Sequence, residues 1–185
     1  LLVIGAETMS RVLDWSDRST CVLFGDGAGA VVLEAREGDA GILSTYIRSN
    51  GAGHDLLCTT GGVSTTQQAG TIYMNGREVF RHAVHCLHEA AETAIDKAGL
   101  SKQDVDWLVP HQANKRIIDA TADKLGLPEE KIVLTIADHG NTSAASVPLA
   151  LAEGNRQGKF ESGDILLLEA MGAGLTWGSS ILRWA

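Results

Sequence analysis

The feature that most constrains the fold is an alternation of apolar runs and helical patterns that fills the C-terminal part of the chain. The apolar runs are typical of buried strands and lie at 105–109, 131–135 and 164–170. Between them, helical periodicity appears at 113–125 and 143–157. A last strand pattern, 175–184, follows the turn "MGAG". Strand–helix alternation with short connections predicts an α/β layered sheet, and the closing strand pair predicts that this sheet is mixed.

The N-terminal part of the chain carries further strand patterns. The run "LLVIGAE" at 1–7 has the continuous apolar character of a buried parallel strand in the middle of a sheet. Because the chain opens on this strand without a methionine, we expect it to continue a longer sequence. Residues 41–50 are predicted to form another strand, and residues 51–70, rich in Gly, Thr and Gln, a long loop.

Three glycines in the stretch "CVLFGDGAGAVVLEA" (21–35) raise the question of a dinucleotide-binding loop. Such a loop follows a strand and opens a helix. Here Gly25, Gly27 and Gly29 lead instead into the strand pattern "AVVL". We therefore predict a tight strand–turn–strand at this place and assign it no cofactor.

A long helix is predicted between Asn75, a suitable N-cap with Glu78 at the capping-box position, and Gly99, which ends it. Helical spacing places these residues on its buried face: Phe80, Val84, Leu87, Ala91, Ile95 and Ala98. Three histidines spaced three apart, at positions 82, 85 and 88, lie on another face. A metal site and a solvated polar face both fit this spacing. We favour the solvated face, since no distant ligand motif completes a metal set, and predict no metal.

Charge and composition argue against several classes of protein. The 185 residues carry a net charge of −8, which offers no general surface for neutralising nucleic-acid phosphates. No window approaches the roughly 18–20 apolar residues of a membrane helix, so no membrane association is expected. Cys21, Cys58 and Cys86 form no CxxC pair, which indicates reduced thiols in a cytosolic protein.

Two polar residues stand in parallel positions on successive strand–helix connections. His111 and Asn141 each follow the carboxyl end of a predicted strand and precede a predicted helix. Ligands bind at that edge of open α/β sheets. The positive end of a helix disfavours imidazolium, so His111 is expected to be neutral. A neutral imidazole and an amide each offer an N–H donor, and two such donors suit an enolate or a thioester oxygen.

The glycine-rich turn within "EAMGAGLTWG" (169–178) is the third element at this edge. It can present a backbone N–H to the same cleft, and Gly140, Gly172 and Gly174 would let a substrate approach the backbone closely. Each element taken alone has a structural explanation, such as a buried histidine or an asparagine turn residue. On physical grounds, the structural and the catalytic interpretation both stay open.

The motifs "VPHQAN", "DHGNTSAAS" and "GAGLTWG", in this order and spacing, resemble the β-ketoacyl-acyl carrier protein synthase III family, the initiating condensing enzymes of type II fatty acid synthesis. The resemblance runs from "LLVIGAE" through "FGDGAGA" to the final "ILRW". It implies a thiolase-like α/β fold, of which this chain would be the C-terminal half. Residues 1–70 would hold the last strand of the N-terminal half with connecting strands and a loop, and residues 71–185 the C-terminal half with the active-site His and Asn.

The family uses a Cys-His-Asn triad, and the resemblance assigns its histidine and asparagine to His111 and Asn141. The nucleophilic cysteine of the family stands in an Ala-Cys-Ala-Gly-type turn, and none of the three cysteines here does. We therefore expect the nucleophile outside this chain. The backbone N–H of Ala173 would complete an oxyanion hole. The family often has phenylalanine where Met171 stands.

The resemblance also implies partners. An acyl group from acyl-CoA would load the absent cysteine, and malonyl-acyl carrier protein would then be decarboxylated and condensed with it. Five residues would contact the phosphopantetheine arm: Met74, Asn75, Gly76, Phe80 and Asn114. Four basic residues would dock the acidic carrier protein: Arg81, Arg116, Lys115 and Lys124. Thioesters of CoA and phosphopantetheine would be substrates, so no cofactor is expected.

Further expectations are a cytoplasmic location, a homodimer, and the N-terminal half of the same enzyme as a partner. Two alternatives stay open: a related Cys-His-Asn condensing enzyme of secondary metabolism, and a catalytically incomplete fragment. The residues of this chain do not identify the primer acyl group.

Overall fold

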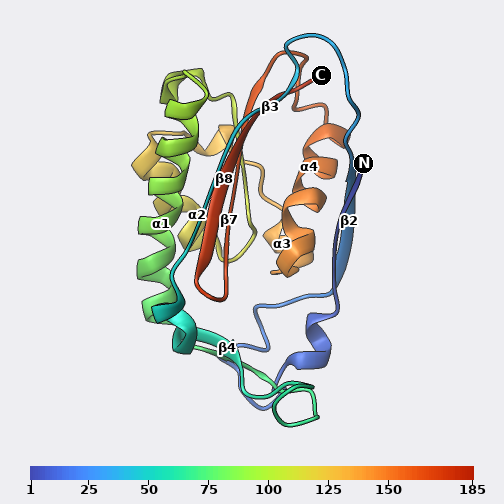
Figure 1. The fold of residues 1–185 in the computed structure, drawn as a ribbon, viewed down its shortest axis with the longest axis vertical. Helices are drawn as coiled ribbons and strands as arrows, with labels where there is room; N and C mark the ends of the chain where they lie inside the picture. The colour runs from blue at the N-terminus through green and yellow to red at the C-terminus, as the bar shows by residue number, and fades with distance from the viewer.

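A computed structural model describes all residues 1–185 and contains a four-stranded central sheet. Its strand order is β3 (Gly41–Ser49), β8 (Thr176–Arg183), β7 (Ile165–Gly172) and β6 (Trp107–Pro110) (Figure 1). β6 runs parallel to β7, whereas β8 is antiparallel to both β7 and β3. The predicted mixed sheet is therefore confirmed.

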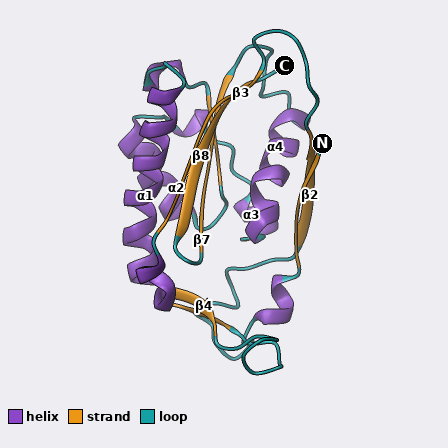
Figure 2. Ribbon diagram, in the orientation of Figure 1, coloured by secondary structure: helices purple, strands orange, loops and turns teal.

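Helices cover both faces of this sheet. α1 (Gly76–Lys97) and α2 (Lys115–Leu125) lie on one face, and α4 (Ser146–Arg156) with the short α3 (Ile136–His139) lies on the other (Figure 2). Beyond α4, a two-stranded antiparallel sheet of β1 (Leu2–Glu7) and β2 (Gly27–Val32) forms an outer layer. No helix is both long enough and apolar enough to cross a membrane.

Two hydrophobic cores fill the spaces on either side of the sheet. Successive residues of a strand point to opposite faces, so Leu108 of β6 joins the core under α1 and α2 while Val109 joins the core under α4. On β7, Leu167 and Leu166 divide in the same way. The continuous apolar runs of the sequence are thus explained by strands that are buried on both faces.

The long helix begins and ends close to the predicted residues. The Asn75 side chain caps α1 by accepting a hydrogen bond from the Glu78 N–H at 3.4 Å, and Gly99 follows it with a positive φ of 71°. The predicted buried stripe is partly wrong, because Phe80, Val84 and Ala98 are only half-buried. The buried residues of α1 are Val79, Ala83, Cys86, Leu87, Ala90, Ala91, Ala94 and Ile95.

The first strand differs from its prediction. β1 pairs antiparallel with β2 alone, so the predicted parallel strand in the middle of a sheet is wrong within these residues. Leu2 and Ile4 expose 60% and 61% of their surface, while Gly5, the residue after Ile4, is buried and packs against the segment after Asn141. One face of β1 is therefore in contact with the rest of the chain and the other is apolar and open.

The predicted strand–turn–strand at 21–35 is half correct. Residues 27–32 form β2, but residues 21–23 form turns, and Phe24 makes a single bridge to Asn141. No helix follows the glycines. A Cβ at Gly25 would lie 2.4 Å from the carbonyl oxygen of His139, so this glycine allows the chain to pass close to the Asn141 loop.

Two other predicted elements are corrected. Residues 131–135 do not form a strand, because their pairing with β6 is limited to one bridge, Leu108–Ile132, which includes the hydrogen bond from Val133 N–H to Leu108 O. Residues 51–70 are not all loop, since they include the 3₁₀ helix η2 (Gly51–Leu56) and the strand β4 (Leu57–Thr59), which pairs with β5 (Ile72–Met74).

The remaining elements are short 3₁₀ turns: η1 (Met9–Val12), η3 (Lys102–Asp104), η4 (Glu129–Lys131) and η5 (Ser143–Ala145). The predicted division of the chain at residue 70 stays a prediction. The central sheet spans it, because β3 precedes this point and pairs with β8 along its length.

Candidate active site

His111 lies directly after β6 and is held by the neighbouring strand. Its backbone N–H donates to the carbonyl oxygen of Glu169 on β7 at 2.7 Å, which extends the parallel ladder by one residue beyond Pro110. Its ring Nδ1 lies 2.5 Å from the Ser146 hydroxyl at the start of α4. The strand end and the helix start therefore both restrain the imidazole.

Burial sets the charge of this histidine. Desolvation lowers the pKa of His111 to about 4, so the imidazole is neutral at pH 7. The predicted neutral state is confirmed. Its cause in the structure is burial, whereas the sequence pointed to a helix N-terminus.

Asn141 lies in a turn whose backbone is fixed by the Phe24 segment. Its N–H donates to Leu23 O and its carbonyl accepts from Gly25 N–H, both at 2.9 Å. The side-chain Oδ1 accepts from the Ser143 N–H at 2.9 Å. Because the side-chain oxygen is engaged inside the turn, the two Nδ2 hydrogens of this buried side chain are left to donate to a group outside the turn.

A glycine makes this turn possible. Gly140 has a φ of 67°, and a Cβ there would lie 3.3 Å from the carbonyl oxygen of Leu23. Positive φ is disfavoured for residues with a Cβ, and the space beside Leu23 is already occupied. The glycine before Asn141 therefore serves the turn that orients the amide.

One cavity of about 1060 Å³ brings the predicted site residues together. His111, Asn141 and Ala173 all line it. They lie after β6, after α3 and between β7 and β8, respectively. It is bordered mainly by apolar side chains, and Met171 at the end of β7 is among them. The prediction that His111, Asn141 and the glycine-rich turn face the same cleft is thus confirmed as a spatial arrangement.

Four of the five residues assigned to a phosphopantetheine arm also line this cavity: Met74, Gly76, Phe80 and Asn114. Asn75 does not, because its side chain points back to cap α1. Asn114 has a second task, since its Oδ1 accepts from the Arg116 N–H at 2.9 Å and caps α2.

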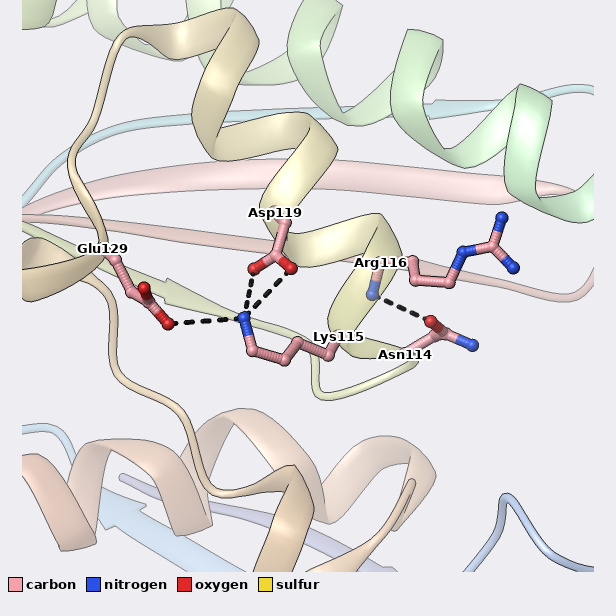
Figure 3. A network of polar contacts seen from close by, with 5 residues as sticks. All are labelled: Asn114, Lys115, Arg116, Asp119 and Glu129. Carbon is pink, nitrogen blue, oxygen red and sulfur yellow. Dashed lines mark hydrogen bonds and ion pairs between the residues drawn. The ribbon is translucent and has the colours of Figure 1, made fainter.

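The four basic residues assigned to docking differ in how free their charges are. Lys115 Nζ lies 2.8 Å from Asp119 and 3.4 Å from Glu129, as Figure 3 shows. Arg81 is paired with Glu78 on the same helix. The Arg116 guanidinium points away from the acidic pair in Figure 3 and lies 5.4 Å from the Phe80 ring centroid.

Arg116 also lines the cavity and has no carboxylate within 4 Å. Lys124, exposed near the end of α2, lies outside the cavity lining. Among the four, Arg116 is therefore the unpaired cation at the mouth of the cavity.

Gln112 supports the site from outside the cavity, a role that the sequence did not assign to it. It is fully buried, and its Nε2 donates to Pro110 O at 2.9 Å and to Val133 O at 3.0 Å. Its Oε1 accepts from the N–H groups of Thr135 at 2.8 Å and Ile136 at 3.1 Å. This one amide joins the strand end that carries His111 to the segment that leads into Asn141.

Glu169 was missed as well. It is 2% exposed, and neither carboxylate oxygen has a hydrogen-bond partner. Burial raises the pKa of Glu169 to about 8, so the side chain is mostly protonated at pH 7. A glutamate inside an apolar strand was the only sequence signal for this group.

The cysteines and the histidine row supply no further catalytic set. Cys58 lines the cavity from β4, while Cys21 and Cys86 do not, and all three are free thiols. His88 Nδ1 lies 3.5 Å from Glu92. No three His, Cys, Asp or Glu side chains are grouped closely enough to hold a metal ion.

Comparison with known families gives two matches, separated by residues 52–94. Residues 95–184 match the family described as 3-oxoacyl-[acyl-carrier-protein (ACP)] synthase III C terminal, and residues 1–51 match the one described as 3-oxoacyl-[acyl-carrier-protein (ACP)] synthase III. The chain is 60% identical to a β-ketoacyl-[acyl-carrier-protein] synthase III of Dinoroseobacter shibae and 61% identical to that of Paracoccus denitrificans. It spans 58% of the length of each relative, and these alignments cover the whole chain.

Solved structures agree on the fold. The crystal structure of 3-oxoacyl-[acyl-carrier-protein] synthase III from Aquifex aeolicus superposes with a TM-score of 0.93 at 48% identity, covering 99% of this chain and 57% of that one. A priming β-ketosynthase from the R1128 polyketide biosynthetic pathway gives 0.91 at 39% identity, covering 100% of this chain and 57% of that one. The thiolase-like fold expected from the sequence is thereby confirmed.

Proposed function

Because this chain belongs to the 3-oxoacyl-[acyl-carrier-protein] synthase III family, we propose that it supplies the histidine and asparagine of a decarboxylative condensing site. The reaction joins an acyl primer from acyl-CoA to malonyl-acyl carrier protein and forms a 3-oxoacyl-acyl carrier protein. The observation that carries the proposal is that neutral His111 and the free Asn141 amide line one cavity as two N–H donors.

The chemistry follows from where negative charge develops. When the malonyl C–C bond breaks, carbon dioxide leaves and the electron pair moves into an enolate. Two neutral donors, His111 and Asn141, stabilise the enolate oxygen in a cavity bordered mainly by apolar groups, where such bonds are stronger than in water. The enolate carbon then attacks the primer thioester, a new C–C bond forms, and the C–S bond to the enzyme breaks.

The nucleophile that carries the primer lies outside these residues in this proposal. The Ala173 N–H is assigned to the oxyanion of the tetrahedral intermediate, together with the N–H of that cysteine. Met74, Gly76, Phe80 and Asn114 border the path of the thioester arm, and the position of Asn75 favours a capping role instead. The substrates are thioesters of CoA and phosphopantetheine, and the reaction requires no other cofactor.

The carrier protein is acidic, so a cation beside the cavity mouth would guide it. Arg116 is the best placed of the four candidates, because it borders the cavity and has no carboxylate partner. Arg81 and Lys124 would contribute at longer range, and the charge of Lys115 is already balanced by two carboxylates. Three further expectations remain predictions: that the N-terminal half of the same enzyme is a partner, that the enzyme is a homodimer, and that it is cytoplasmic.

A second candidate is a condensing enzyme of secondary metabolism. The observation that favours it is the similarity to the priming β-ketosynthase noted above, whose fold and length match nearly as well. Both candidates use the same donors and differ in the carrier that they accept. Turnover with carrier proteins from fatty acid and polyketide synthesis would separate them.

The test is to measure the two stages separately in the complete enzyme that carries this segment. We expect His111→Ala and Asn141→Ala each to reduce malonyl decarboxylation by about 10²–10³, the usual effect of losing one oxyanion donor. Acylation of the cysteine by acyl-CoA, followed by intact mass, should change far less, because no enolate forms in that stage.

Ser44→Ala serves as the control, since it removes a part-buried hydroxyl that donates to Ala94 O, between β3 and α1. Equal losses in both stages for His111→Ala and Asn141→Ala would contradict the division of roles. Absence of any acylation in the unsubstituted enzyme would refute the proposed function itself.

A further inference from the structure

Ser146 carries a buried hydroxyl that contacts the two residues at the start of the β6–α2 connection. It is the first residue of α4 and is 1% exposed. Two polar atoms lie within hydrogen-bond distance of its Oγ: His111 Nδ1 at 2.5 Å and the Gln112 backbone nitrogen at 3.2 Å. Ser146 is the last residue of the motif "DHGNTSAAS" that carries Asn141, but the sequence assigned it no role and did not connect it to His111.

The direction of these hydrogen bonds follows from counting donors and acceptors. The Gln112 N–H can only donate, so Ser146 Oγ accepts that bond. The Ser146 hydroxyl hydrogen then needs an acceptor, and His111 Nδ1 is the one atom in reach that can serve. A buried hydroxyl without an acceptor is costly, so the opposite arrangement is disfavoured.

We infer that Ser146 is a positioning residue that fixes the His111 tautomer, with Nδ1 unprotonated and the hydrogen on Nε2. If Nδ1 carried the hydrogen, Ser146 would have to accept from it, and its own hydrogen would be left without a partner. His111 would then present a bare Nε2 lone pair, which repels an oxyanion. Only the tautomer selected by Ser146 turns this histidine into a donor.

Gln112 supports the same arrangement from the other side. Its side chain makes four hydrogen bonds to backbone groups, and its backbone N–H meets Ser146 Oγ. The Ser146 hydroxyl is therefore held between two adjacent residues of the β6–α2 connection. This geometry explains why a serine at the start of α4 acts on a residue 35 positions earlier in the chain.

The test is ¹⁵N NMR of histidine-labelled complete protein without substrate, with the His111 signals assigned by their loss in His111→Gln. In the unsubstituted protein, we expect Nε2 to be protonated and Nδ1 to be bare. In Ser146→Ala, the tautomer ratio should move toward Nδ1–H by roughly 10- to 100-fold, the factor that corresponds to an unsatisfied buried hydroxyl. Ser146→Thr, which keeps a hydroxyl, should restore the original ratio.

The catalytic consequence rests on the proposed function, and the NMR result does not. In an active enzyme, Ser146→Ala should reduce decarboxylation by a similar factor and leave acylation unchanged, and Ser146→Thr should recover decarboxylation. Nδ1–H in the unsubstituted protein would overturn the inference even if Ser146→Ala failed to fold. An unchanged ratio in folded Ser146→Ala would also overturn it, whereas a correct tautomer without condensing activity would refute the proposed function alone.

Discussion

Replacing Gln112 by methionine is the sharpest test of how the site is held together. Methionine has a similar length and fills a similar space, so the substitution removes polar groups without opening a large cavity. The Gln112 amide makes four hydrogen bonds to backbone groups of residues 110, 133, 135 and 136. All four groups lose their side-chain partner in Gln112→Met.

The magnitude can be worked out from burial. Pro110, Val133 and Thr135 belong to the buried residues, whereas Ile136 is half-buried and water can reach its N–H. Each buried group left unsatisfied costs about 1–3 kcal/mol, so three of them give roughly 3–6 kcal/mol after partial relaxation. Domains of this size are typically stable by only about 5–15 kcal/mol, so the variant should be close to unfolding.

The assay is urea denaturation of the complete protein, followed by circular dichroism and by tryptophan fluorescence. Gln103→Met is the matched control, because Gln103 is an exposed glutamine in η3 and should change stability by less than about 0.5 kcal/mol. A loss of under about 1 kcal/mol in Gln112→Met would refute the reasoning. It would mean that the strand end carrying His111 and the segment leading into Asn141 hold their positions without this amide.

Two further predictions concern charge. Burial raises the pKa of Glu169 to about 8, so between pH 4.5 and pH 8 the folded state holds a proton that the unfolded chain has lost, and stability falls as pH rises. Glu169→Gln should abolish this pH dependence of stability. In urea titrations, the free energy of unfolding of the variant should rise by on the order of 2–4 kcal/mol relative to that of the unsubstituted protein between pH 5 and pH 8. A difference between the two proteins that does not change with pH would contradict the reasoning. Arg116→Glu should raise the KM for malonyl-carrier protein by roughly tenfold in steady-state assays, with a weaker salt dependence. Lys115→Glu is the control for Arg116→Glu, because Asp119 and Glu129 already neutralise the charge of Lys115. An equal effect of the two substitutions on KM would argue against Arg116 as the main contact.

The elements that the sequence predicted well are those whose signals are local. The Asn75 cap, the positive-φ glycine that ends α2 at Gly126, and the apolar runs of β6 and β7 all depend on residues within one turn or one strand. The predicted strand at 131–135 failed because strand formation needs a neighbour along its whole length, and β6 offers one bridge. Strand pairing is decided between segments, and the apolar pattern of one segment does not record it.

The same distinction holds for the candidate site. His111 and Asn141 were predicted because each stands at a strand end before a helix, a position visible in the chain itself. Gln112, Ser146 and Glu169 were not, because their roles arise from partners 21 to 35 positions away or from burial alone. Nothing in a short stretch of sequence reveals which backbone groups an amide will meet.

The sequence by itself determined the class of fold, the order of most elements and the two donors at the edge of the sheet. It did so because hydrophobic periodicity, caps and turn glycines act over a few residues. The tertiary structure alone decided that β1 is an antiparallel outer strand and that His111 is neutral through burial. It also decided that Gln112 and Ser146 hold the loops around His111. Those properties depend on solvent exclusion and on contacts between distant segments, which exist only once the chain has packed.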